Sequence, residues 1–303
     1  MAGADQARVY DTATMTPIGP PLAPTIHPIP GVMTLSPDGT RAATVSITQT
    51  EVLDVTTGHS LWTAPGGGLT PPRFSPDGSR LAVGGFDSNV RVHDATTGQP
   101  LATRNLNAGN IFFGPDWSPN GRLLAVSAIG LTGPMILDAD TGTTQSGPYD
   151  ANALAFAPDS KHAALFGSEL RLVDITTGTV ERTLRGHANL YGGTYAPDGH
   201  TIGAGWYSGL FENIDLTTGI RVGNPIRLTP DFNLDPPSVA NNPTGFYAGT
   251  LTGPVVAYHY EPAHWEQTAC EAAGRNLTRA EWTSYLDDLD PYHPTCPQYP
   301  AGT

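Results

Sequence analysis

The sequence predicts an all-β fold built from repeated units of four short strands. Gly and Pro, the residues of tight turns, number 35 and 29 among 303 residues, whereas charged residues make up only 14%. Two turn signals recur in step along most of the chain, one of the type Ser-Pro-Asp-Gly and one of the type Thr-Thr-Gly. Proline presets the first corner of such turns and glycine accepts positive φ angles. The short apolar and β-branched runs between these turns are therefore predicted to be strands.

The first turn signal sets the length of the repeat. Its copies begin at Ser36, Ser75, Ser118, Ala157 and Ala196, and a worn copy is Asn242-Pro243-Thr244-Gly245. Successive copies lie about forty residues apart, which is typical of the blades of a β-propeller. The second signal follows each of the first five copies in step, as Thr-Thr-Gly or, once, Asp140-Thr141-Gly142.

The order of elements within one repeat is clearest around residue 80. After Ser75-Pro76-Asp77-Gly78 we expect a second strand at 81–84, a third strand ending in Asp94, and an outer strand at 99–103 beyond Thr96-Thr97-Gly98. The same order predicts units near 32–66, 67–108, 109–149, 150–186, 187–229 and 236–260, with a partial unit at 8–22.

Residues 1–261 are thus predicted to form a propeller of six four-stranded blades. The sixth unit lacks an outer strand, and we expect residues 17–22 of the partial unit to supply it, because closing the ring removes free sheet edges. A seven-blade ring with one incomplete blade is the alternative.

From about residue 8 to residue 260 the units resemble the WD40 repeat family. The order of strands and the Ser-Pro-Asp-Gly turn match that family, and the resemblance implies a β-propeller. Two sequence features that are typical of the WD40 family are weak in this chain. The Trp of the Trp-Asp pair is absent, and the Gly-His that precedes a blade survives only as Gly186-His187. The residues in place of that Trp are Tyr10, Leu53, His93, Leu137, Val173 and Ile214.

The repeating pattern of turns and strands ends at about residue 262, and residues 262–303 are predicted to form a short helical tail. Residues 264–273 lack Gly and Pro and end before Gly274, while Thr278 and Glu281 fit the capping box of a second helix. The tail resembles the end of the WD40 region in large bacterial signalling proteins that carry a STAND-type nucleotide-binding domain. The resemblance implies such a domain upstream, in a longer parent protein.

The tail also holds both cysteines, Cys270 and Cys296. No targeting signal and no apolar run of about 20 residues is present, so we predict a soluble, cytoplasmic protein without membrane contact. In that reducing compartment we expect the two cysteines to be free thiols packed near each other, and a disulfide is the alternative.

The net charge of -13 disfavours nucleic acid as a partner.

Enzyme signatures are weak. The only lysine, Lys161, is followed by His162, so no phosphate-binding loop of the Gly-Lys-Ser/Thr type exists. The nearest histidine pair, His259 and His264, lacks further ligands at suitable spacing, and Asp138-Ala139-Asp140 lacks the distal Glu of a calcium loop. We predict a protein that is not an enzyme, with no catalytic residue, cofactor or metal site.

The remaining functional signal is a set of aromatic and acidic residues on loops opposite the repeated turns, where rigid side chains supply contact area. We predict a non-enzymatic scaffold or sensor that binds a protein or peptide partner, in bacterial signalling. The alternative is a lactonase-like or hydrolase-like enzyme with a site in the central channel, which requires several inward carboxylates or histidines. The predicted partner-binding residues are Phe86, Asp87, Phe112, Phe113, Tyr149, Tyr191, Trp206, Tyr207 and Phe232.

Overall fold

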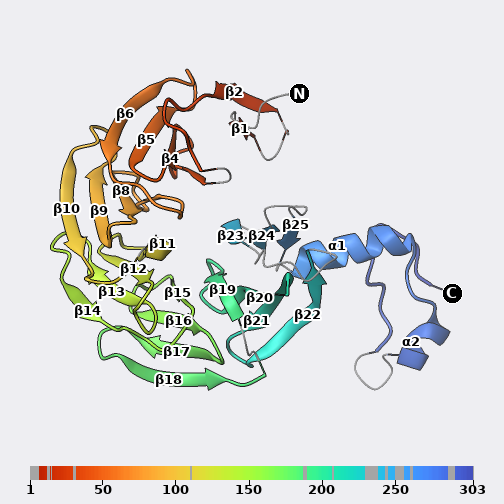
Figure 1. Ribbon diagram of the computed structural model, residues 1–303. Helices are drawn as coiled ribbons and strands as arrows, with labels where there is room; N and C mark the ends of the chain where they lie inside the picture. Colours follow the sequence, from red (N-terminus) through yellow and green to blue (C-terminus); the bar gives the residue numbers. More distant parts are fainter. Residues whose placement is uncertain are drawn as a thin grey trace.

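The computed structural model describes residues 7–11, 14, 16–29, 32–109, 111–186, 190–206, 208–228, 238–242, 245–249, 256–259, 262–285 and 291–302. These residues form antiparallel β-sheets that follow one another along an arc, and a short helical tail (Figure 1). The predicted fold class is confirmed: the protein is all-β, its repeating unit is a four-stranded blade, and only the tail is helical.

Five consecutive sheets have four strands each, and each runs from an inner to an outer strand in chain order. The first contains β3 (Met33–Leu35), β4 (Arg41–Val45), β5 (Gln49–Asp54) and β6 (Ser60–Pro65). The second contains β7 (Arg73–Phe74), β8 (Arg80–Gly84), β9 (Asn89–Asp94) and β10 (Pro100–Asn105). The third contains β11 (Ile111–Trp117), β12 (Leu123–Ala128), β13 (Met135–Asp138) and β14 (Thr144–Ser146). The fourth contains β15 (Ala153–Phe156), β16 (His162–Phe166), β17 (Leu170–Asp174) and β18 (Thr179–Leu184), and the fifth β19 (Leu190–Tyr195), β20 (Thr201–Trp206), β21 (Leu210–Asp215) and β22 (Ile220–Arg227).

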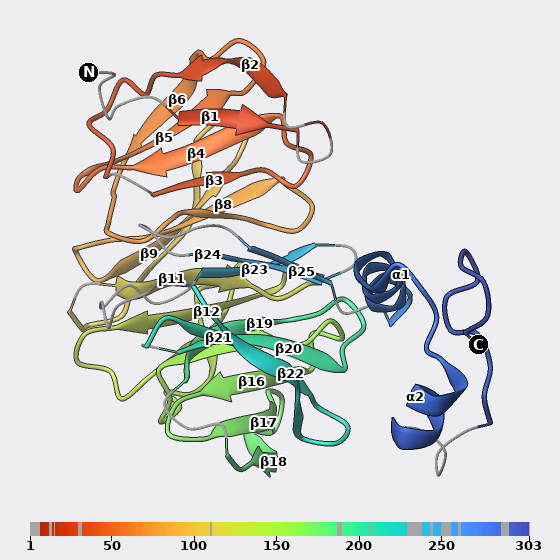
Figure 2. The ribbon, with the colours of Figure 1, turned by 90° about the vertical axis from the view of Figure 1, so that its right-hand side faces the viewer.

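Shorter sheets stand before and after these five. An N-terminal hairpin consists of β1 (Ala7–Tyr10) and β2 (Pro17–Leu22), and a three-stranded sixth sheet of β23 (Ser238–Asn242), β24 (Gly245–Gly249) and β25 (Val256–His259). The tail contains α1 (Pro262–Ala273) and α2 (Arg279–Tyr285), which lie beside the stacked sheets in Figure 2.

The second strands are mostly apolar because both of their faces are buried. Successive side chains of a strand point to opposite faces. In β8, Leu81 and Val83 therefore pack toward the first sheet while Ala82 packs toward the third. In β16, Leu165 faces the third sheet and Phe166 the fifth. Six hydrophobic cores of this kind join the hairpin and the six sheets in chain order.

The Ser-Pro-Asp-Gly turn is a closed hydrogen-bonded unit. In the second sheet Ser75 Oγ donates to Asp77 Oδ1 at 2.5 Å, the amide of Ser79 donates to the same oxygen at 3.0 Å, and the amide of Arg80 donates to Ser75 Oγ at 3.0 Å. Gly78 closes the turn with a φ of 72°, which suits glycine. These hydrogen bonds stabilise the charged carboxylate and lower the pKa of Asp77 to about 2.

Substitutions at Asp77 test this turn. Asp77→Asn should cost less stability at pH 7 than Asp77→Ala, because it keeps an acceptor oxygen, as in the third sheet, where Asn120 Oδ1 accepts from Ser118 Oγ at 2.8 Å. Asp77→Ala loses the bonds that the carboxylate accepts from Ser75 and Ser79, and we expect a cost of about 1 kcal/mol. The wild-type carboxylate stabilises the fold above its unfolded pKa of 3.8 and loses that contribution as the pH falls to about 2.

Urea unfolding at pH 7 and at pH 2 measures both effects. Asp77→Asn should lose less stability on acidification than the wild type, because its side chain does not titrate. An asparagine variant as unstable as the alanine variant at pH 7 would contradict the proposed turn chemistry.

Aromatic and arginine side chains tie adjacent sheets together on the turn side. Trp117, 6% exposed, donates its Nε1 hydrogen to the carbonyl of Arg73 in the second sheet at 2.8 Å. The guanidinium of Arg80 lies 4.7 Å from the centre of the Trp117 ring and forms an ion pair with Asp140 at 2.7 Å. Trp62 makes the corresponding bond from the first sheet to the carbonyl of Ala95 at 3.1 Å.

The N-terminal hairpin differs from the expectation. Residues 17–22 pair with β1 and, within the described strands, not with the sixth sheet. Instead Leu22 and Val9 pack on Leu53 of the first sheet. Fully buried Glu51 fixes the connection that follows, since its carboxylate accepts from the Thr25 amide at 2.9 Å and the Thr25 hydroxyl at 2.8 Å.

The tail is held by a disulfide between Cys270 and Cys296, whose Cα atoms lie 5.5 Å apart. The expectation of free thiols was wrong, because α1 and a buried asparagine bring the two chain segments together. Asn276 Oδ1 accepts from the Cys296 amide at 2.8 Å and its Nδ2 donates to the Tyr299 carbonyl at 2.9 Å.

The predicted capping box of the second helix is confirmed. Thr278 donates its amide hydrogen to Glu281 Oε2 at 2.8 Å, and the Glu281 amide donates to Thr278 Oγ1 at 3.2 Å. Neither helix in the described part of the chain has the length and apolar character needed to cross a membrane.

Candidate binding surface

The antiparallel order of each sheet creates two different faces. The Ser-Pro-Asp-Gly and Thr-Thr-Gly turns lie at one end of the strands, and we call this end the turn face. The connections between second and third strands, and those between successive sheets, lie at the other end, which we call the loop face. In the first three sheets the loop face contains residues 46–48, 66–72, 85–88, 106–109 and 129–134.

Neighbouring loops of this face are hydrogen-bonded to one another. The Phe86 amide donates to the Gly67 carbonyl at 3.1 Å, and the Leu106 amide donates to the Ser88 carbonyl at 2.9 Å. Further along, the Gly109 amide donates to the Ile129 carbonyl at 2.6 Å. Backbone groups that might otherwise need water are thus paired between loops, so the face has a defined shape before any partner arrives.

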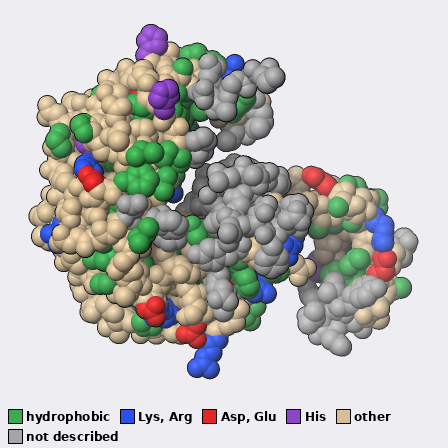
Figure 3. Space-filling model, in the orientation of Figure 1, with side chains coloured by type: hydrophobic (Ala, Val, Ile, Leu, Met, Phe, Trp, Pro, Cys, Tyr) green, Lys and Arg blue, Asp and Glu red, His purple; other side chains and the backbone are tan. Residues whose placement is uncertain are grey.

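Three aliphatic side chains are exposed on these loops. Ile47 is 61% exposed, Ile129 55% and Leu69 48%. On the side seen in Figure 3, hydrophobic side chains gather in the region of β4, β8 and β11. A contiguous exposed apolar patch is the usual mark of a recognition site.

Phe86 and Asp87, predicted as contact residues, lie on this face in the β8–β9 loop. Phe86 is half-buried and Asp87 is exposed. Asp87 forms a two-pronged ion pair with Arg91, with Oδ1 3.0 Å from Arg91 Nη1, and this pair strongly lowers the pKa of Asp87. The acidic group is therefore oriented by its own strand.

Tyr149, Tyr191 and Trp206 are half-buried rather than free on the loops. Tyr149 packs against the core between the third and fourth sheets, and Trp206 against the core between the fourth and fifth. Tyr149 Oη and Trp206 Nε1 are buried, and no described group bonds to them. The side chains of Phe112 and Phe113, and residues Tyr207 and Phe232, lie outside the described part of the structure.

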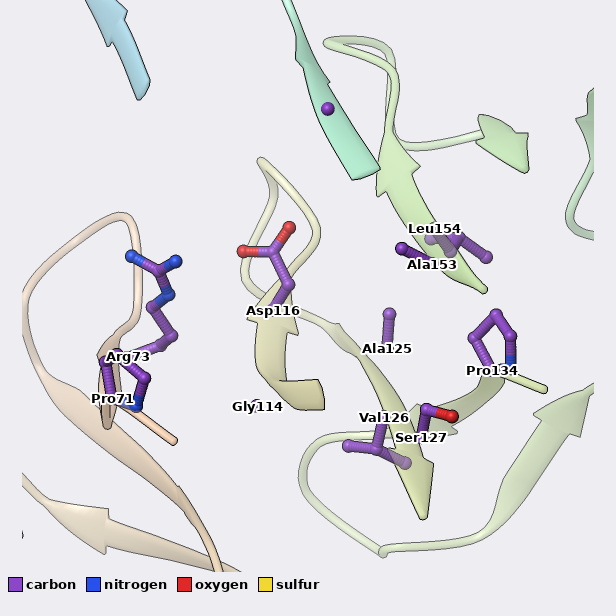
Figure 4. A pocket seen from close by; sticks show the side chains of 11 residues that line it. Pro71, Arg73, Gly114, Asp116, Ala125, Val126, Ser127, Pro134, Ala153 and Leu154 are labelled. Carbon is purple, nitrogen blue, oxygen red and sulfur yellow. The ribbon is translucent and has the colours of Figure 1, made fainter. Parts of the chain in front are cut away.

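The inner strands surround a central cavity of about 190 Å³. Figure 4 shows Arg73 of β7 and Asp116 of β11 projecting into the same space, with Ser127 and the apolar side chains of Ala153 and Leu154 around them. Asp116 is exposed to solvent within the cavity. Partial desolvation by the surrounding protein raises the pKa of Asp116, and the positive charge of Arg73 opposes the rise.

The sequence interpretation missed Arg73 and Asp116, although a signal for them exists. Each stands two residues before the Ser of its turn, next to a large side chain, Phe74 or Trp117, that is buried between sheets. Because side chains alternate along a strand, the neighbour of a residue buried against one sheet points to the opposite face of its strand.

Comparison with known proteins agrees with this architecture over one repeat. The family model described as WD domain, G-beta repeat, matches residues 52–94, which run from the third strand of the first sheet to the third strand of the second. His93 stands where that family has its Trp. It is 3% exposed, its Nδ1 lies 3.0 Å from the Gly98 carbonyl oxygen, and its ring is 5.9 Å from that of Trp62. No curated protein matches the chain.

Proposed function

We propose that this protein is a non-enzymatic interaction module that presents its loop face to a protein or peptide partner. WD40 repeats and folds of this kind generally mediate interactions between proteins. The observation that carries the proposal is the exposure of Ile47, Leu69 and Ile129 on loops that are hydrogen-bonded to neighbouring loops. A preorganised apolar surface binds at a low cost in conformational entropy.

The residues that we propose as the main contacts are not the same as those predicted from the sequence. The exposed aliphatic groups supply the apolar centre, and half-buried Phe86 with the Asp87–Arg91 pair supplies its rim. A polar rim around an apolar centre is the common arrangement of protein interfaces.

Charge substitutions on the loop face test the proposal. Partners are first identified by crosslinking and mass spectrometry with the tagged protein in extracts of its own cells, and the affinity of the purified partner is then measured. Ile47→Asp and Ile129→Asp should each weaken that affinity about tenfold or more, because a carboxylate would be desolvated at the interface.

Leu101→Asp is the matched control. Leu101 is 55% exposed, as Ile129 is, but it lies on the outer strand β10. The control should bind like the wild type, and all three variants should unfold at the wild-type urea concentration. Equal binding by the loop variants, or loss of binding only in the control, would contradict the proposal.

The alternative function, a channel hydrolase, receives less support. Of the described residues that line the cavity, Asp116 is the one carboxylate and Arg73 the one cation. The lactonase-like chemistry considered above uses several inward carboxylates or histidines. The single pair of Arg73 and Asp116 is sufficient to bind a polar group but not to hold a catalytic metal ion.

We further propose that the parent protein acts in bacterial signalling, in the cytoplasm, with a STAND-type nucleotide-binding domain upstream. The support is the resemblance of residues 262–303 to the tail of such proteins. The genomic sequence upstream of Met1 tests this: an in-frame nucleotide-binding region supports it, and an ordinary intergenic region overturns it.

A further inference from the structure

A group of metal-binding side chains gathers at the turn end of the fourth sheet. His162 begins β16, Asp174 ends β17, and Glu181 lies on β18. One potential ligand atom from each of the three lies within 4.8 Å of the others, and His162 Nε2 is 3.6 Å from Glu181 Oε2. We propose that His162, Asp174 and Glu181 form a binding site for a first-row divalent metal ion, with Zn²⁺ as the best match.

The position of each ligand follows from the strand register. His162 and Asp174 are directly opposite each other on adjacent strands. On β18, Val180 pairs with Val173 and Arg182 with Leu172, so Glu181 is the extra residue of a β-bulge. Bulges re-aim side chains, and this one brings the Glu181 carboxylate to the imidazole.

The other four-stranded sheets supply an internal comparison, because they use the same scaffold without these ligands. The residues opposite the conserved turn Asp are Arg41, Arg80, Leu123 and Thr201. The bulge residues of the first three sheets are Leu61, Leu101 and Gln145. Of these sheets, the fourth alone combines His, Asp and Glu at the three positions.

The imidazole is already oriented for metal binding. His162 Nδ1 lies 2.5 Å from Asp159 Oδ2, which directs Nε2 toward Asp174 and Glu181. A metal-binding His commonly donates its second ring hydrogen to a carboxylate in this way. Asp174 is also fixed, since its Oδ1 accepts from the amides of Thr176 at 2.7 Å and Thr177 at 2.9 Å.

The local charge favours a dication. Three carboxylates, those of Asp159, Asp174 and Glu181, surround one imidazole. Arg182, which follows Glu181, is directed instead to the carbonyls of Leu216 and Thr217 in the fifth sheet.

The spacing also suits a four-coordinate ion. Metal–ligand bonds of about 2.0–2.2 Å place neighbouring ligand atoms of a tetrahedral ion roughly 3.3–3.6 Å apart. The 3.6 Å between His162 Nε2 and Glu181 Oε2 is near this value, and the Glu181 side chain, 49% exposed, has room to rotate. One imidazole with two carboxylates is a donor set that Zn²⁺ accepts, with further positions left for water.

Calorimetric titration of the metal-free protein with Zn²⁺ tests the site, together with the visible absorption of bound Co²⁺. The wild type should bind one Zn²⁺, and His162→Ala and Glu181→Gln should each abolish this binding. Asp159→Asn should weaken it about tenfold, because the imidazole loses its orienting carboxylate.

His200→Ala is the matched control, since His200 stands in the corresponding turn of the fifth sheet, where the described residues form no such cluster. It should bind Zn²⁺ like the wild type. The proposal is overturned if the wild type binds no Zn²⁺, or if His162→Ala and Glu181→Gln bind it unchanged. Circular dichroism shows whether each variant is folded, and Glu181→Gln, a substitution on the surface, keeps the test valid if His162→Ala unfolds.

Discussion

Trp117→Ala is expected to lower the free energy of unfolding by about 3–5 kcal/mol, the usual cost of removing a buried aromatic side chain. The indole is 6% exposed and belongs to the core between the second and third sheets. Its loss would leave a cavity, remove the ring beneath the Arg80 guanidinium, and leave the Arg73 carbonyl without its donor. Urea unfolding followed by circular dichroism measures the change.

Two further variants separate packing from hydrogen bonding. Trp117→Phe keeps most of the volume and loses the hydrogen bond to Arg73, so we expect a cost of about 1 kcal/mol. Trp62→Ala removes a half-buried indole with a similar bond to Ala95, and it should cost less than Trp117→Ala. If Trp117→Ala cost no more than Trp117→Phe, the indole would not be a core group.

Removal of the disulfide should lower the stability of the tail and leave the stability of the sheets unchanged. In Cys270→Ser/Cys296→Ser, amide hydrogens in residues 262–302 should exchange faster, because the bond closes a 26-residue separation and such a loop contributes about 3 kcal/mol. The tail has a small core of its own, centred on Trp282, whose ring lies 5.4 Å from that of Tyr292. Hydrogen exchange followed by mass spectrometry measures the exchange rates of the tail and of the sheets separately.

Exchange in β7–β18 should stay at the wild-type rate, and treating the wild type with a reductant should reproduce the variant. Unchanged protection of the tail would show that Asn276 and Trp282 hold it without the disulfide. Disulfides persist in oxidising compartments and are rare in the cytoplasm.

The strands were predictable because turn residues mark their ends. The predicted strand at 81–84 is β8 (Arg80–Gly84), and the predicted third strand ends at Asp94 as β9 does. Partnership between distant segments was not predictable. Residues 17–22 could pair with the open edge of any sheet. The packing of Leu22 against Leu53 places them beside the first sheet. The disulfide likewise depends on a spatial approach set by Asn276, which separation along the chain does not reveal.

The sequence predicts which loops form the loop face, but it does not predict which side chains of these loops are exposed. Aromatic residues were expected outside, yet Tyr149 and Trp206 partly fold back onto the cores, because large rings gain most from burial. Ile47 and Ile129 remain exposed instead. The cluster around His162 depends on a bulge at Glu181, and a bulge is a property of strand register that a single sequence does not display.

The row of six cores has a consequence for how the molecule comes apart. The third sheet is clamped by cores on both sides, whereas the N-terminal hairpin has one described core, against the first sheet. Where each unit contacts only its neighbours, loss of structure spreads by fraying from the termini. The third sheet, whose loop carries Ile129, thus belongs to the slowest-opening part of the chain, and a partner bound there would sit on the region that survives longest.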